Sequence, residues 1–291
     1  FNKSEIIGTI KEFLEGSICD KKKVVIILPA LRDYLSPITI SEIFEKISKE
    51  ESPELKKWLL KALGELVDVI GSLRTLSIIA NSFSEDVIKK GYRKILIAGL
   101  AALYRLYISS PEGRDRIISL IRDIMLKDDF VSELLRQAKS TYDYTEAAAA
   151  MWVVSTFPDF FVTPEVVRVA VYVLSRHGEK ALVETSTAIE RVLQKSVDNR
   201  ELIKISHFVN HPDPRVREGI ALALGKLLSS GNLRALRPLL KLARDERSSV
   251  KRIACEAIIN VINQLGSDDY KLAIYALIGS RWSVAINAAL L

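Results

Sequence analysis

A short pattern of residues, V-[RK]-x-x-[IA]-x-x-A-[LI], recurs near the end of this chain at a fixed interval. Copies begin at Val216 and Val250, and a third opens at Val284, so consecutive copies start 34 residues apart. A fixed period of roughly 20 to 50 residues is typical of repeat proteins, in which each helix pair buries its apolar face by stacking on its neighbours. The interval therefore predicts an elongated array of helix pairs.

Nearly every segment of the chain has the apolar spacing of three and four residues that is typical of helices, so we expect an all-α fold. Helix starts are expected where a capping side chain precedes a proline, because proline suits the first helical position. These starts are Ser52-Pro53, Ser110-Pro111, Thr163-Pro164 and Asp213-Pro214. The predicted helix pairs are 4–14 with 21–35, 41–49 with 53–70, 73–83 with 86–108, 164–176 with 180–196, 199–209 with 214–229, and 232–244 with 249–265.

Weaker copies of the pattern extend the array towards the N-terminus. The copy that opens at Leu55 is the best of them, and it matches the copy at Val216 up to the glycines Gly64 and Gly225. All anchors together lie near residues 23, 55, 92, 144, 181, 216, 250 and 284. The longest interval holds an irregular inserted segment around 110–142. We therefore predict one solenoid over residues 1–291 with about seven to eight helix pairs.

The C-terminal helix expected from Ser283 ends about two turns earlier than its counterpart from residue 249, and its outer face is apolar. End repeats of a solenoid normally present a polar outer face. Two interpretations stay open. Either the last repeat is truncated because the chain is a piece of a longer protein, or this end is covered by a second copy or another partner.

The extended pattern V-R-x-x-A-x-x-A-L-G-x-L, best matched at 216–228 and 250–262, resembles that of HEAT repeats, close to the short variety of many prokaryotic proteins. The resemblance implies a right-handed α-α superhelix with first helices on the convex face and second helices on the concave face. It also implies that the basic residue after the first Val is a structural partner for an acidic residue of a neighbouring repeat. Arg217, Lys251 and Arg93 occupy this position.

The motifs of common enzymes are missing from the sequence, including those for nucleotide binding, zinc proteases and serine hydrolases. Histidine, the most frequent general acid or base, occurs only at His177, His207 and His211. We therefore expect neither catalysis nor a cofactor. His207, His211 and Asp213 have the spacing of a zinc or nickel site, but histidines near a helix end also interact favourably with the helix dipole, and we favour that interpretation.

Cysteine and hydropathy indicate the compartment. Cys19 and Cys255 lie in apolar helical contexts and are predicted to be buried thiols instead of a disulfide. The longest apolar stretch, 95–104, is far shorter than the roughly 20 residues of a membrane span, so we expect no membrane partner and a cytoplasmic protein. The scarcity of glutamine is weakly typical of thermophiles.

Positive charge is concentrated in the last third of the chain. The net charge is +6, and residues 200–291 account for all of it, with 14 Lys and Arg against 8 Asp and Glu. On the helix predicted at 232–244, four cations spaced by three and four residues form one stripe, Arg234, Arg237, Lys241 and Arg244. Further candidates near the connections are Arg215, Arg247, Arg252 and Arg281. The stripe would hold successive phosphates or an acidic protein segment, and the alternative is a solvated surface.

A second candidate surface is aromatic. Phe157, Phe160 and Phe161 follow Trp152 beside the inserted segment, and exposed aromatic clusters are frequent centres of protein interfaces. The alternative is that they fill the core between two irregular repeats.

Two functions fit these observations. The first is a non-enzymatic scaffold for protein partners. The second is a nucleic-acid-binding protein resembling the HEAT-like alkylpurine DNA glycosylases, for which Trp58 and Trp152 would lie on second helices, although no motif of that family matches. The two differ in geometry, because a phosphate-binding protein needs its cations on one continuous face.

Overall fold

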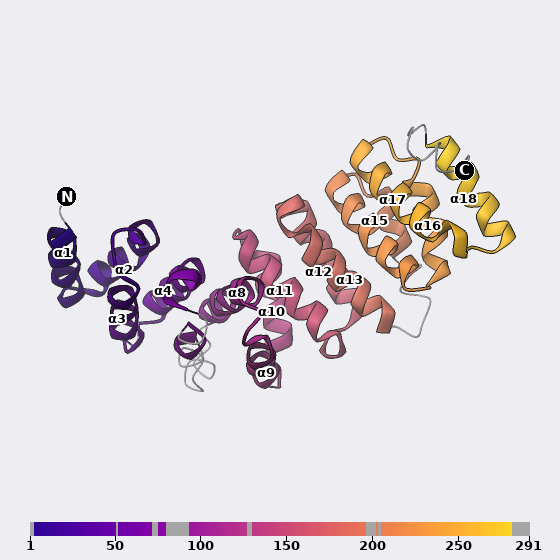
Figure 1. The fold of residues 1–291 in the computed structure, drawn as a ribbon. Helices are drawn as coiled ribbons and strands as arrows, with labels where there is room; N and C mark the ends of the chain where they lie inside the picture. The colour runs from indigo at the N-terminus through magenta and orange to yellow at the C-terminus, as the bar shows by residue number, and fades with distance from the viewer. Residues whose placement is uncertain are drawn as a thin grey trace. The chain divides into compact units, whose positions relative to one another are not determined.

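The computed structural model describes residues 3–50, 52–71, 75–79, 93–126, 130–195, 202 and 205–280. The α-helices and the short 3-10 helices (η) are α1 (Lys3–Glu15), α2 (Ile18–Ile27), η1 (Leu28–Leu31), α3 (Pro37–Ser48), α4 (Pro53–Glu65), α5 (Val67–Ile70), α8 (Arg93–Ser109), α9 (Arg114–Met125), α10 (Phe130–Ser140), α11 (Tyr144–Thr156), η2 (Pro158–Phe160), α12 (Thr163–His177), η3 (Gly178–Ala181), α13 (Leu182–Lys195), η4 (His207–Asn210), α15 (Pro214–Ser229), η5 (Leu233–Ala235), α16 (Leu236–Leu242), α17 (Ser248–Val261), η6 (Ile262–Gln264) and α18 (Ser267–Gly279). These described residues include no strand, so the all-α prediction is confirmed (Figure 1).

The chain forms two compact units, residues 1–137 and residues 138–291, which we call unit 1 and unit 2. In unit 1, the helices α2, α4 and α8 pack against one another in that order. The preceding helix of each pair packs on this row, α1 on α2 and α3 on α4. The second helices of successive pairs therefore form the spine of unit 1, as a solenoid requires.

Unit 2 has the same construction. Its second helices α11, α13, α15 and α17 pack in that order, α12 packs on α13, and α16 packs on α15, α17 and α18 (Figure 1). Since each helix contacts mainly its neighbours along the array, the solenoid packing predicted from the 34-residue interval is confirmed.

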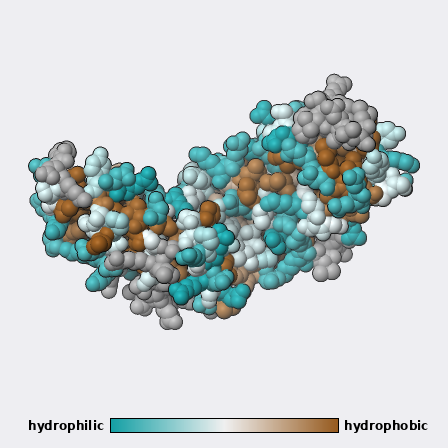
Figure 2. All heavy atoms as spheres, in the orientation of Figure 1, coloured by the Kyte–Doolittle hydropathy of each residue, from teal (hydrophilic) through white to brown (hydrophobic). Residues whose placement is uncertain are grey.

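The apolar positions of the repeated pattern form the core. In α15 and α17 seven of the eight residues at these positions are completely buried, and Ala257 is half-buried; the seven are Val216, Ile220, Ala223, Leu224, Val250, Ala254 and Ile258. Hydrophilic residues cover most of the face seen in Figure 2, and hydrophobic ones show through in patches. Burial of one helical stripe per repeat is the expected result of the spacing of three and four residues.

The glycine of the pattern lets consecutive second helices approach closely. A Cβ added to Gly225 in α15 would lie 2.8 Å from Cβ of Ala257 in α17. A Cβ added to Gly64 in α4 would lie 3.3 Å from Cα of Ala102 in α8. Because both contacts involve atoms that no rotamer change can move away, a larger residue at either position would push the two helices apart.

Three of the four predicted helix starts are confirmed, those of α4, α12 and α15. The side chains of Ser52 and Asp213 accept hydrogen bonds from the first-turn amides of α4 and α15, each directly before a proline. The prediction at Ser110 is wrong, because residues 111–113 form a turn and α9 begins only after Gly113, whose φ is 94°. At α12 the cap position falls on Val162, and the hydroxyl of Thr163 donates instead to the carbonyl of Val192.

Three other expectations concern the two cysteines, the inserted segment and the C-terminal repeat. Cys19 is exposed, which contradicts the predicted burial, because it lies on the solvent side of α2, whereas Cys255 is buried as predicted. The segment around 110–142 holds α9 and α10, two helices between consecutive second helices. Arg281, the copy at Val284 and the last repeat lie outside the described residues.

Candidate functional site

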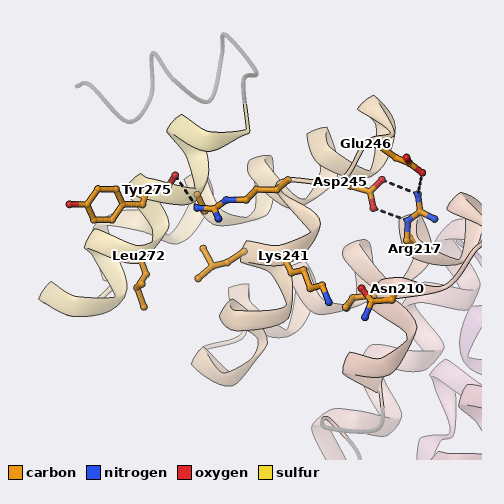
Figure 3. Close-up of a pocket in the computed structure, with 11 residues that line it drawn as sticks. Asn210, Arg217, Lys241, Asp245, Glu246, Leu272 and Tyr275 are labelled. Atoms are coloured by element: carbon orange, nitrogen blue, oxygen red, sulfur yellow. Dashed lines mark hydrogen bonds and ion pairs between the residues drawn. The ribbon is translucent and has the colours of Figure 1, made fainter.

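One candidate surface of unit 2 lies between η4, the α16–α17 connection and α18, and we call it the C-terminal groove. It is an open groove of about 700 Å³. Figure 3 shows the side chains that line it, which are Val209, Asn210, Arg217, Leu240, Lys241, Arg244, Asp245, Glu246, Leu272, Tyr275 and Ala276. The helices position these residues because α16 packs between η4 and α18.

One part of the C-terminal groove is apolar. Leu240 of α16 and Leu272 and Tyr275 of α18 line this part, and both α18 side chains are exposed. Leu272 and Tyr275 are three residues apart, so they lie on the same face of the helix. This arrangement offers apolar area to an apolar side chain of another molecule.

The other part of the groove is basic. Lys241 and Arg244 are exposed, and Figure 3 shows that Lys241 extends towards Asn210. The guanidinium of Arg244 donates one long hydrogen bond, 3.5 Å, to the carbonyl of Tyr275. Both cations therefore keep donors for an anionic group next to the apolar surface.

A buried ion pair fixes the far wall of the groove. The guanidinium of Arg217 donates to both oxygens of Asp245 at 2.7 and 3.0 Å, and each side chain is only 8% exposed. The same guanidinium donates to the carbonyls of His211 and Pro212. The hydrogen bonds with Asp245 raise the pKa of Arg217. Asp245 belongs to the following repeat, so Arg217 makes the structural contact that the HEAT resemblance implies.

A second groove follows the second helices α13, α15 and α17, and we call it the second-helix groove. Lys226 lies at its centre and donates to the hydroxyl of Thr187, and burial lowers the pKa of this lysine. Arg191 lies 3.7 Å from the buried Glu190, and Arg252 lies 3.2 Å from Glu256. The second-helix groove is thus lined by alternating charges.

The structure divides the predicted cations among different surroundings. Lys241 and Arg244 line the C-terminal groove, whereas Arg234 and Arg237 are exposed and line neither groove. The stripe also differs from one continuous helix, because α16 covers only 236–242, Arg234 lies in η5 and Arg244 lies beyond the helix end.

The remaining cations are held locally or point elsewhere. Arg215 forms a bidentate ion pair with Asp213, and this hydrogen bonding lowers the pKa of Asp213. Arg252 lines the second-helix groove, and Arg247 is exposed at the start of α17.

The aromatic candidates separate into buried and exposed residues. Phe157 and Phe161 are buried, and Phe160 is partly exposed and meets Phe157 edge-to-face with ring centroids 6.4 Å apart. Trp152 is buried in α11. Of these residues, only Phe160 offers substantial surface to a partner.

The histidine arrangement favours a local structural role. The ring Nδ1 of His211 accepts a hydrogen bond from the backbone N–H of Asp213. Among the residues that the structure describes, no group of three or more His, Cys, Asp or Glu side chains is arranged to hold a metal ion. None of the described helices is both long enough and apolar enough to cross a bilayer.

The sequence did not identify the apolar half of the C-terminal groove. In the sequence, Leu272 and Tyr275 have the spacing of ordinary core residues of a helix. Only their exposure in the structure identifies them as candidate contact residues. Asp245 was also missed as the partner of Arg217. A usable signal was present, since an acidic residue in the turn before each second helix is what the paired arginine requires.

Comparisons with known proteins agree with this architecture. Residues 163–259, from α12 into α17, match the family model described as HEAT repeats, so this part of the chain contains HEAT repeats and the recognition made from the sequence is confirmed. A search of curated proteins found no match.

Several solved structures are similar to this chain over most of its length. One is a crystal structure of Kap121p, which is 13% identical to this chain with a TM-score of 0.43. The matched region covers 95% of this chain and 33% of the Kap121p chain. Kap121p bound to Nup53p has 15% identity and a TM-score of 0.39, and the karyopherin Kap121p bound to the extreme C-terminus of the protein phosphatase Cdc14p has 15% and 0.40. In each of these two structures the matched region covers 99% of this chain and 37% of the Kap121p chain. The chain thus spans about a third of these proteins, and at such TM-scores the likeness assigns no partner.

Proposed function

We propose that this protein is a non-enzymatic scaffold that binds a protein partner through the C-terminal groove. The observation that carries the proposal is that the exposed Leu272 and Tyr275 and the half-buried Leu240 line the same groove as the two exposed cations Lys241 and Arg244. HEAT repeats in residues 163–259 supply a rigid row of helices on which such a groove keeps its shape.

The groove favours a partner segment that carries apolar side chains next to carboxylates. Three cations and two carboxylates line it, and Arg217 and Asp245 neutralise each other, so Lys241 and Arg244 dominate the field that an incoming chain meets. The apolar contact would supply affinity, and the charges would set specificity and orientation.

A peptide-binding experiment tests this proposal. The probe is a short fluorescent peptide in which Leu and Phe are flanked by Glu, and the readout is fluorescence anisotropy against the full chain. The double substitution Lys241→Glu and Arg244→Glu is expected to weaken binding by at least about tenfold, because it replaces two charge-assisted contacts by repulsion. Leu272→Ala is expected to weaken it by removing apolar contact.

The matched control uses the other two cations of the predicted stripe. Arg234→Glu with Arg237→Glu makes the same change of net charge on neighbouring residues that line neither groove, and it should alter peptide affinity by less than about twofold. Equal losses in both pairs would mean that only total charge matters, and the groove proposal would fail. An absence of peptide binding at low salt would also contradict it.

The positions of the cations favour a protein partner over duplex nucleic acid as the ligand of the basic C-terminal third. Lys241 and Arg244 line one groove, Arg252 lines the other, and Arg215 and Arg252 already pair with carboxylates. A salt-titrated assay with duplex DNA and structured RNA separates the two functions. A steep decrease of affinity with salt that depends on all four stripe cations would support the nucleic-acid alternative instead.

A further inference from the structure

Three tyrosines near the start of unit 2 are unusually exposed. Tyr142 lies in the turn between α10 and α11 and is 87% exposed, Tyr144 opens α11 and is 44% exposed, and Tyr172 in α12 is 49% exposed. None of them lines either groove described above. Exposed aromatic rings on a folded surface are available to stack against another planar group.

A cation covers one side of each of these rings. Lys139 Nζ lies 4.4 Å from the centroid of Tyr172, the guanidinium carbon of Arg176 lies 4.6 Å from that of Tyr142, and Lys180 Nζ lies 5.0 Å from that of Tyr144. All six residues belong to unit 2. We call this set of three tyrosines and three cations the tyrosine–cation surface.

The three cations of this surface are not neutralised by carboxylates that the structure describes, unlike five other cations of unit 2. The cations Arg191, Lys195, Arg215, Arg217 and Arg252 each form an ion pair with a carboxylate. Within the described part of the chain, Lys139, Arg176 and Lys180 form none and instead lie over tyrosine rings. An exposed cation–π contact is weak, so the positive charge remains available to an anion.

In the described part of the chain, no nearby carboxylate forms an ion pair with these three cations. Asp143 lies between Tyr142 and Tyr144 in the chain, but its Oδ1 accepts the N–H of Thr145 and caps α11. The buried Glu146 accepts the hydroxyl hydrogen bond of Thr141 and so is directed inward. Glu179 is exposed and is the acidic neighbour of Lys180 in η3.

The turn that presents Tyr142 is held rigidly. Arg176 Nη1 donates to the carbonyls of Lys139, Ser140 and Thr141 at 3.1–3.2 Å, so it closes the C-terminal end of α10 while its guanidinium stacks on Tyr142. A ring fixed in this way loses little conformational entropy when a ligand stacks on it.

We propose that the tyrosine–cation surface binds single-stranded nucleic acid. Bases would stack on the open sides of Tyr142, Tyr144 and Tyr172, and the backbone phosphates would lie beside Lys139 and Lys180. Alternation of planar aromatic rings with uncompensated cations is the arrangement that sequence-tolerant single-strand binding requires. A duplex fits this surface poorly, because its bases are already stacked on each other.

Anisotropy of a labelled oligothymidine of about 15 nucleotides, measured with the full chain at low salt, tests the proposal. Tyr142→Ala and Tyr172→Ala are each expected to weaken binding about tenfold, whereas Tyr142→Phe, which keeps the ring, should bind as the unaltered protein does. Lys139→Glu with Lys180→Glu should abolish most binding. The logarithm of affinity should decrease with the logarithm of salt concentration with a slope of about −1.4, as two phosphate contacts imply.

Two controls make the result decisive. Tyr275→Ala removes an exposed tyrosine in the C-terminal groove and should leave oligothymidine affinity unchanged, although it weakens the acidic peptide of the proposed function. Far-UV circular dichroism and thermal melting confirm that each variant is folded. The proposal is overturned if a duplex of equal length binds as tightly, if Tyr142→Ala has no effect, or if the single strand does not bind. None of these outcomes bears on peptide binding by Lys241 and Arg244.

Discussion

Arg217 shows how one side chain joins consecutive repeats. Its guanidinium is buried, pairs with both oxygens of Asp245 in the next repeat, and donates to two backbone carbonyls of the turn before α15. A buried pair of this kind contributes little net stability compared with apolar residues, but removing one partner leaves a charge buried without compensation. The pair therefore fixes the register between repeats.

Arg217→Ala is expected to lower the free energy of unfolding of unit 2 by about 3–5 kcal/mol, because Asp245 would remain buried without its partner. Urea denaturation followed by circular dichroism measures the change. The control is Arg215→Ala two residues earlier, whose pair with Asp213 is exposed on the arginine side and should cost no more than about 1 kcal/mol. Equal losses in the two variants would show that the burial of Arg217 is unimportant.

His177 makes stability depend on pH. Burial lowers its pKa below the ordinary value of 6.5, with Arg176 and Lys180 acting in the same direction and Asp143 opposing them. Its Nε2 is buried without a hydrogen-bond partner in the described structure. A protonated imidazole is therefore tolerated better in the unfolded chain than in the folded one.

Since the folded pKa of His177 is lower than the unfolded one, the unfolded chain binds more protons once the pH falls below about 6.5, and stability decreases there. At pH values above this window the imidazole is neutral in both states, so it adds no pH dependence to stability. We expect the decrease between neutral and mildly acid pH to be smaller in His177→Gln. Urea denaturation of both proteins over this range measures it, and an identical pH dependence would refute the assignment.

At the scale of helices, the glycine of the repeated pattern sets the distance between second helices. Gly225 in α15 faces Ala257 in α17, and Gly64 in α4 faces Ala102 in α8. Glycine in a helix costs roughly 1 kcal/mol relative to alanine. Glycine nevertheless occupies the same position of the pattern in α4 and α15, because the close approach of consecutive helices buries more apolar area.

Gly225→Ala is expected to destabilise unit 2 by about 1–2 kcal/mol, since overpacking against Ala257 exceeds the gain in helix propensity. Adding Ala257→Gly should restore part of the loss by removing the opposing Cβ. Gly8→Ala in α1 is the control, because a Cβ there meets no atom within 4 Å, and it should stabilise the protein by about 0.5–1 kcal/mol. Thermal or urea denaturation compares the three, and a stabilising Gly225→Ala would contradict the packing argument.

For the whole molecule, the division into unit 1 and unit 2 implies partial independence. Each unit has its own row of second helices and its own buried residues. Repeat arrays are stabilised by neighbour contacts, so a unit with several intact contacts can fold without the rest of the chain.

We expect a shortened chain that begins at Phe130, which keeps α10 whole, to fold by itself. In this chain Arg217→Ala should lower the unfolding free energy by about the same amount as in the full chain, because the Arg217–Asp245 contact lies within unit 2. Circular dichroism and urea denaturation of the shortened protein measure both points. A shortened chain without cooperative unfolding would show that unit 2 depends on unit 1.

Much of the local structure could be predicted from the sequence. The caps at Ser52 and Asp213 and the buried positions that follow Val216 were predictable because caps and apolar spacing act over a few residues. The cap at Ser110 was not, because the positive φ of Gly113 inserts a turn that the Ser-Pro signal does not reveal. A cap signal such as Ser110-Pro111 can compete with a nearby turn signal such as Gly113, and the sequence does not show which of the two the chain adopts.

The sequence alone determined an all-α array and its HEAT-like repeats, since both follow from a periodic pattern in which every repeat has the same neighbours. The resemblance to HEAT repeats implied the pairing role of Arg217. Only the tertiary structure decided which exposed residues meet. It separated Lys241 and Arg244 from Arg234 and Arg237, and it brought Lys139 over Tyr172. These placements depend on how different helices pack on one another, and no periodic constraint of the sequence fixes which side chains then meet.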